Sequence, residues 1–187
     1  MALKHAILAA LREESASGYE LSKRFDISVA NFWAATPQQI YRELERLEQD
    51  GLVEAELVEQ SSRPNKRVFT VAPAGLEELD DFVAAAPKPT AIRDDLLVKV
   101  AALDESNTGA VAGAVRERLA QSEAKLDLYE RLRSKMLGDL EEEELMASSG
   151  SIGSYLTLLR GISFEEGNRD WCRSVLEIVD GARSGTA

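Results

Sequence analysis

Basic side chains gather in one short stretch of an otherwise acidic chain. Residues 61–67 hold three of them and no acidic residue: Arg63, Lys66 and Arg67. Serine and asparagine in the same stretch add hydrogen-bonding groups. Lysine and arginine neutralise phosphates, so a basic loop of this kind suits contact with a nucleic-acid backbone or minor groove. Taken alone, the same run is also typical of a solvated turn.

A polar helix face upstream of this loop offers side chains that can read bases. At about 100° per residue, a helix over residues 37–50 groups its apolar side chains on one side: Ile40, Leu44 and Leu47. The opposite side is polar: Gln38, Arg42, Glu45, Arg46 and Gln49. Glutamine pairs with adenine edges, and arginine pairs with guanine or a phosphate. An ordinary solvated helix face has the same pattern, but the helix and the basic loop together favour nucleic-acid binding.

Composition excludes several other kinds of chemistry. The 187 residues include one cysteine and one histidine, which leaves neither a disulfide framework nor the ligands of a histidine-based metal site. Gly-rich phosphate loops and pairings of a nucleophile with a base are absent from the sequence. We therefore expect no enzyme, no metal and no cofactor. Without a signal peptide or an 18-residue apolar run, we expect a cytoplasmic protein that makes no contact with membranes.

The elements that position these side chains follow from periodicity and capping signals. The first half predicts helices near residues 3–11, after Ser17 and after Thr36, then strands over 52–58 and 68–71, and a helix from Pro73. Two stretches, 17–20 and 36–39, have the form of a capping box, and Gly51 fits a helix C-cap. Three helices followed by a hairpin with a long loop, residues 59–67, is the order of a winged helix-turn-helix module. Its third helix would enter the major groove.

The second half predicts helices only. Apolar residues recur at spacings of 3 and 4 over residues 92–103, 111–136 and 152–179. One small domain has little against which to bury two long apolar stripes, so we expect them to pair with a second copy of the chain. The expected fold is mainly α, with a winged helix-turn-helix domain at 1–86, a Pro-containing connector at 87–90 and an all-helical dimerisation and effector domain at 91–187.

Several spaced motifs in the first 86 residues resemble the PadR family of transcriptional regulators. They occupy residues 18–21, 32–33, 36–44, 47–53 and 63–71, and Ala74–Gly75 follows. In the second half, residues 92–99 and 160–171 resemble the helical C-terminal domain of the longer PadR subgroup. Gln38 departs from the small residue common at its position in the family, and Ala72 departs from a common threonine. Because Gln38 lies on the presumed DNA face, the base preference of relatives does not carry over.

The resemblance implies a homodimeric DNA-binding regulator, usually a repressor, that a small molecule releases from an inverted-repeat operator. The residues predicted to contact DNA are Tyr19, Lys23, Gln38, Gln39, Tyr41, Arg42, Arg46, Arg63, Lys66 and Arg67. Tyr41 borders the apolar stripe, so packing in the core is an equal alternative to contact with a phosphate. A small aromatic or hydrophobic effector would meet Tyr155, Phe164 and Trp171, although aromatic residues at helical spacing are more often core or interface. A redox role for Cys172 has no resolving partner to support it.

Net charge supplies the alternative interpretation. The chain carries 22 basic and 33 acidic residues, a formal charge of -11, and the first 86 residues alone carry -6. Since DNA is a polyanion, an acidic helical dimer could be a protein-interaction module that has lost DNA binding. If the DNA-binding interpretation holds, the acidity predicts weak binding to random sequences and dependence on a matched site.

Overall fold

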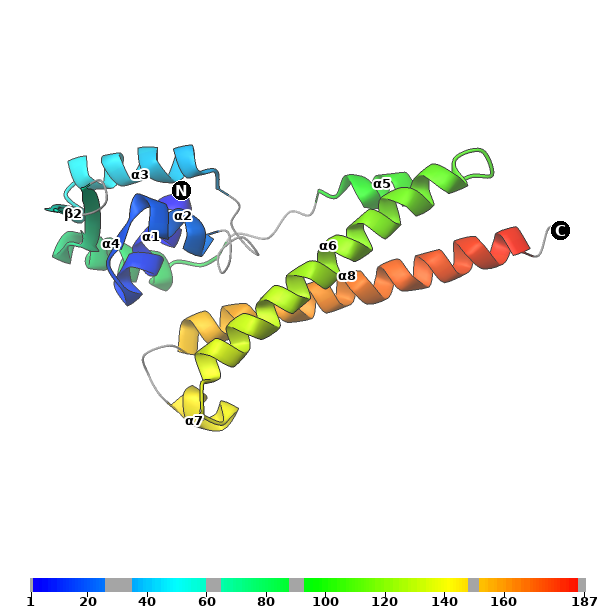
Figure 1. The fold of residues 1–187 in the computed structure, drawn as a ribbon. Helices are drawn as coiled ribbons and strands as arrows, with labels where there is room; N and C mark the ends of the chain where they lie inside the picture. The colour runs from blue at the N-terminus through cyan, green and yellow to red at the C-terminus, as the bar shows by residue number, and fades with distance from the viewer. Residues whose placement is uncertain (1, 26–34, 60–64, 88–92, 148–151, 185–187) are drawn as a thin grey trace. The chain divides into compact units, whose positions relative to one another are not determined.

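The computed structural model describes residues 2–25, 35–59, 65–87, 93–147 and 152–184. These residues form two compact units, which divide the chain near residue 88. Within the described residues, the first unit consists of four helices and three short strands, and the second is entirely helical (Figure 1). This arrangement confirms the predicted mainly α fold class. No helix in the described part of the chain is both long and apolar enough to cross a membrane.

The described residues of the first unit form seven elements. In chain order they are α1 (Ala2–Glu13), β1 (Ala16–Ser17), α2 (Gly18–Arg24), α3 (Pro37–Gln49), β2 (Val53–Val58), β3 (Lys66–Val71) and α4 (Pro73–Ala84). The strands are antiparallel in the order β1–β3–β2, with Ala16 opposite Phe69 and Val53 opposite Val71. Strand β1 has only two residues, too few to show an alternating pattern, and the sequence did not predict it.

One hydrophobic core holds these elements together. The three residues of the predicted α3 stripe, Ile40, Leu44 and Leu47, are buried, as are Phe25, the C-cap of α2, and Phe69 of β3. Both capping boxes are present, and Gly51 adopts a left-handed φ of 70° where α3 ends. The predicted helix starts are therefore confirmed. The C-cap of α3 is Asp50, so the glycine predicted to end the helix lies one residue after the cap.

The predicted hairpin loop is shorter than the sequence indicated. Lys66 and Arg67 belong to β3, where Lys66 pairs with Val58 and Arg67 with Leu57 across the strands. Placing both residues in a loop was wrong. The strand was predicted from its β-rich apolar residues, and two adjacent basic residues lack that signal although they can pair in a strand at the end of a hairpin. Arg63 lies outside the described residues.

The second unit consists of α5 (Asp95–Ala101), α6 (Thr108–Leu137), α7 (Glu142–Ala147) and α8 (Ile152–Ser184). Helices α6 and α8 run antiparallel and pack along their lengths (Figure 1). Two apolar clusters join them, one around Val115 and Cys172 and the other around Tyr129 and Ile162. A buried carboxylate, Glu165, accepts hydrogen bonds from Ser122 of α6 and Asn168 of α8.

Candidate nucleic-acid interface

The N-terminus of α3 is fixed by a reciprocal capping box. The backbone N–H of Gln39 donates to Thr36 Oγ1 at 3.3 Å, and the backbone N–H of Thr36 donates to Gln39 Oε1 at 2.8 Å. Pairing with an adenine edge needs both the oxygen and the nitrogen of a glutamine amide. Because the cap occupies the Gln39 oxygen, that side chain serves the helix start. Gln38, one residue earlier, is exposed and takes no part in this capping box.

The exposed face of α3 carries two arginines in different surroundings. Arg46 Nε lies 3.8 Å from Asp50 Oδ2 one turn later, a loose surface pair. Arg42 is exposed and has no acidic partner in the described parts of the chain. Its guanidinium is therefore the one on α3 that is available for an anion from outside the molecule.

Tyr41 lies on the border between core and surface, as its position on the helix predicted. Its side chain is 45% exposed. The ring lies so close to Gly18 of α2 that a Cβ at that glycine would come within 3.0 Å of three ring atoms. Gly18 therefore gives the ring room against the start of α2. The sequence did not single out this contact, because the two residues are 23 positions apart.

Helix α2 adds an aromatic and a cation next to each other. Tyr19 is 61% exposed, and Lys23 follows one turn later with its Nζ 4.8 Å from the centre of the Tyr19 ring. This distance is within the range of a cation–π interaction. No carboxylate pairs with Lys23 in the described ranges, so its charge is available to an external anion.

The two basic residues of β3 are held by carboxylates of the neighbouring helices. Lys66 Nζ donates to Glu20 Oε1 of α2 at 2.9 Å, and Arg67 Nη2 donates to both oxygens of Glu48 of α3 at 2.6 Å. The backbone N–H and hydroxyl of Ser17, followed by Lys66, stabilise the charged form of Glu20 and lower its pKa from 4.5 to about 2. Neither carboxylate was predicted from the sequence as a partner of the basic stretch.

The three effector candidates do not converge on one site. All lie on α8, and Trp171 follows Tyr155 by 16 positions, about 24 Å along the helix. Tyr155 is fully buried and its hydroxyl accepts a hydrogen bond from Arg133 Nε at 3.2 Å. Phe164 is 48% exposed beneath Arg160, and Trp171 packs against the cluster around Cys172.

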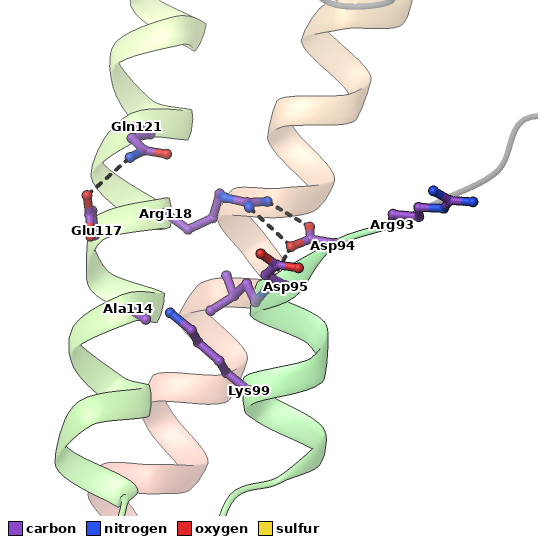
Figure 2. A pocket seen from close by; sticks show the side chains of 9 residues that line it. Arg93, Asp94, Asp95, Lys99, Ala114, Glu117, Arg118 and Gln121 are labelled. Atoms are coloured by element: carbon purple, nitrogen blue, oxygen red, sulfur yellow. Dashed lines mark hydrogen bonds and ion pairs between the residues drawn. The ribbon is translucent and has the colours of Figure 1, made fainter.

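An open cavity of about 460 Å³ lies instead between α5 and α6 (Figure 2). Charged side chains of both signs line most of it: Arg93, Lys99, Arg118, Asp94, Asp95 and Glu117. Arg118 donates two hydrogen bonds to Asp94, which also caps α5. None of the effector candidates lines this cavity, and its charges balance, so it gives no preference for an anion or a cation. No cluster of possible metal ligands occurs among the described residues.

Comparison with known proteins finds matches along nearly the whole chain. Residues 7–81 match the model of the transcriptional regulator PadR-like family, and residues 92–180 match that of the virulence activator alpha C-terminal region. A probable transcriptional regulator of Mycobacterium tuberculosis, Rv1176c, is 35% identical over 98% of this chain and 100% of its own length. The negative transcriptional regulator PadR of Bacillus subtilis is 27% identical over 95% of this chain and 97% of its own.

Two solved structures of Bacillus subtilis PadR are similar over both units. The complex with operator DNA has a TM-score of 0.77 at 28% identity and covers 93% of this chain and 97% of the other. The complex with p-coumaric acid has a TM-score of 0.69 at 27% identity and covers 96% of each chain. The fold of the whole chain is therefore that of a regulator with a winged-helix domain and a helical domain.

Proposed function

Since this chain belongs to the PadR-like family of transcriptional regulators, we propose that it is a homodimeric repressor that binds an inverted-repeat operator and is released by a small molecule. The family consists of regulators, not enzymes. In this proposal residues 1–86 bind DNA, residues 87–90 connect, and residues 91–187 hold the dimer and the effector. The proposed compartment is the cytoplasm, where a regulator meets its operator.

One observation carries the DNA-binding part of the proposal: the distribution of unpaired positive charge. The first 86 residues include nine lysines and arginines. Six of them lie within 4.0 Å of a carboxylate: Lys4, Arg12, Arg24, Arg46, Lys66 and Arg67. Arg63 is outside the described residues. The remaining two, Lys23 and Arg42, lie on α2 and α3, the two helices of the helix-turn-helix.

The family's ligand is DNA, a polyanion, and these two cations are well placed to neutralise its phosphates. With α3 in the major groove, its N-terminal residues face base edges and the preceding helix crosses the backbone. Gln38 would then read a base, Arg42 a guanine or a phosphate, and Lys23 a phosphate. Tyr19 and Tyr41 would contact the backbone from the surface between α2 and α3.

Dimerisation supplies the affinity that one such surface lacks. Apolar side chains remain exposed on the second unit, among them Val98 of α5 and Leu156, Phe164 and Ile178 of α8. A second copy would cover such residues, and two α3 helices about 34 Å apart would read two half-sites. The p-coumaric acid complex of Bacillus subtilis PadR supports a small aromatic effector, with Tyr155, Phe164 and Trp171 as the residues to test.

Selection of binding sites from random DNA by the purified protein tests the proposal. The expected result is an inverted repeat bound by a dimer. On that duplex, Arg42→Ala should weaken binding and lower the salt slope by about 0.9 for each phosphate that the variant no longer neutralises. Arg131→Ala, which removes an exposed arginine from the second unit, is the matched control. Failure to enrich any duplex would favour the alternative, a dimer that binds only proteins.

A further inference from the structure

The carboxylates that hold the basic residues of β3 come from the two helices of the proposed DNA surface. Glu20 is on α2 and pairs with Lys66, while Glu48 is on α3 and pairs with Arg67. The pairs therefore join β3 to both helices of the helix-turn-helix. Lys23 and Arg42 lie on the same helices without a carboxylate among the described residues.

Both pairs use the donors that a phosphate would need. Arg67 Nη2 is 2.6 Å from each oxygen of Glu48, so one nitrogen of the guanidinium faces the whole carboxylate. Carboxylate and phosphate oxygens accept the same charge-assisted hydrogen bonds from arginine and lysine. A phosphate that takes Arg67 must displace Glu48, or share the guanidinium with it and endure the repulsion of its charge.

Solvent exposure permits that exchange. The Arg67 side chain is 48% exposed and that of Glu48 is 35% exposed. Exposed ion pairs are weak enough to open, yet strong enough to alter a binding constant severalfold. Glu20 is held more firmly than Glu48, because it also accepts hydrogen bonds from the backbone N–H and the hydroxyl of Ser17 at 2.8 and 2.7 Å.

We propose that Glu48 and Glu20 compete with DNA phosphates for Arg67 and Lys66 and thereby lower the affinity of this regulator for DNA. The inference rests on the proposed function, since it assigns a role to residues of the same surface. Every duplex that takes the two cations must open the two pairs or bear the repulsion of their carboxylates. The loss of affinity therefore applies to all such duplexes, and the contacts of Gln38 and Arg42 remain to distinguish the operator.

Glu48→Gln tests the proposal against a control on the same helix. Glu45→Gln removes the same charge one turn earlier, from an exposed residue without a cationic partner in the described chain. On the selected duplex, Glu48→Gln should tighten binding by about two- to fivefold more than Glu45→Gln, the size expected for opening one exposed ion pair. Equal effects of the two variants would show a general effect of charge and overturn the proposal.

A double-mutant cycle with Arg67→Gln isolates the pair itself. When Arg67 is absent, Glu48→Gln should have only the effect of Glu45→Gln, because no cation remains to be released. If Glu48→Gln instead weakens binding, the carboxylate positions Arg67 for DNA and the competition is refuted. Glu20→Gln, which keeps a side chain able to cap α2, gives the same test for Lys66.

The outcomes separate this inference from the proposed function. If the wild-type protein selects no duplex, the proposed function fails. If it selects an operator but the cycle shows no coupling between Glu48 and Arg67, only the competition fails. Thermal unfolding of each variant, followed by circular dichroism, verifies that the compared proteins are folded at the temperature of the binding assay.

Discussion

Replacing Gly18 with alanine should have opposite effects depending on whether residue 41 is tyrosine. In the wild type, the new Cβ would come within 3.0 Å of three atoms of the Tyr41 ring. Real Cβ atoms do not approach other atoms so closely, so the ring or helix α2 must move. Overpacking of this kind costs about 1–3 kcal/mol of unfolding free energy.

The backbone itself favours the substitution. Among the described glycines, only Gly51 and Gly138 have a positive φ, so Gly18 has a conformation that alanine can adopt. Alanine in a helix is more favourable than glycine by up to about 1 kcal/mol, and less in a first turn. We therefore expect Gly18→Ala to destabilise the wild type by a net amount of about 1–2 kcal/mol. In a Tyr41→Ala background it should stabilise by about 0.5 kcal/mol.

Urea denaturation of the four proteins, at one protein concentration, measures the coupling. A fixed concentration is needed because the stability of a dimer depends on concentration. The expected coupling between positions 18 and 41 is about 1–3 kcal/mol. An equal loss of stability in both backgrounds would refute the steric argument, because the cost would then arise at Gly18 alone. If Tyr41 also contacts DNA, Gly18→Ala should weaken operator binding only when Tyr41 is present.

Three further predictions concern ionisable groups. The pKa of Glu20 in the folded protein is lowered to about 2, so its charged form stabilises the fold above pH 4.5. That contribution disappears as the pH falls toward 2. The difference in unfolding free energy between wild type and Glu20→Gln, measured by urea denaturation, should shrink over the same interval. Burial by itself raises the pKa of Glu165, but hydrogen bonds from Lys125, Ser122 and Asn168 together lower it below its usual range. Glu165→Ala should therefore lower the unfolding free energy by about 2–3 kcal/mol, because it leaves Ser122 buried without its partner. Glu165→Gln should lower it less. Equal losses of unfolding free energy in urea denaturation would contradict this prediction. Burial also raises the pKa of the Cys172 thiol, so a thiol reagent should modify it only as the protein unfolds, and rapid reaction with the native protein would restore a redox role.

Local signals in the sequence were enough to predict most of the fold. The capping boxes at Ser17 and Thr36 and the glycine after α3 depend on neighbours within a few residues, and all three are present. The α3 stripe was likewise predictable, because one helix period determines which side is buried. Helix α5 begins only at Asp95, three residues later than the first apolar residue of the predicted pattern, because Asp94 caps it there.

Contacts between distant residues could not be predicted in the same way. Gly75 illustrates the difficulty: a Cβ there would collide with the backbone carbonyl of Leu52, which cannot rotate away as a side chain can. The pairs of Glu20 with Lys66 and Glu48 with Arg67 depend on the packing of β3 against two helices. In one sequence, nothing distinguishes these carboxylates from other acidic residues. The polar face of α3 was predictable, but which of its charged side chains pair with neighbours was not.

The salt dependence of operator binding can determine whether the two β3 cations reach DNA. Among the described residues of the first unit, Lys23 and Arg42 are the two cations without a carboxylate partner, which makes four in a dimer. With a slope of about -0.9 for each phosphate neutralised, these four predict a slope near -4, whereas adding Lys66 and Arg67 predicts about -7. Repulsion between DNA and an acidic domain is also screened by salt and flattens the absolute slope.

Comparing wild type with the double variant Lys66→Gln and Arg67→Gln removes most of that common repulsion. A slope that becomes less steep by about 3 to 4 would mean that DNA takes all four of these cations from their carboxylates. An unchanged slope would mean that both pairs stay closed on the operator and that other cations, such as Lys23 and Arg42, make the phosphate contacts. The wild-type chain has a net charge of -11 whichever outcome is found. The positions of its charged side chains, and not their sum, therefore determine which cations contact DNA.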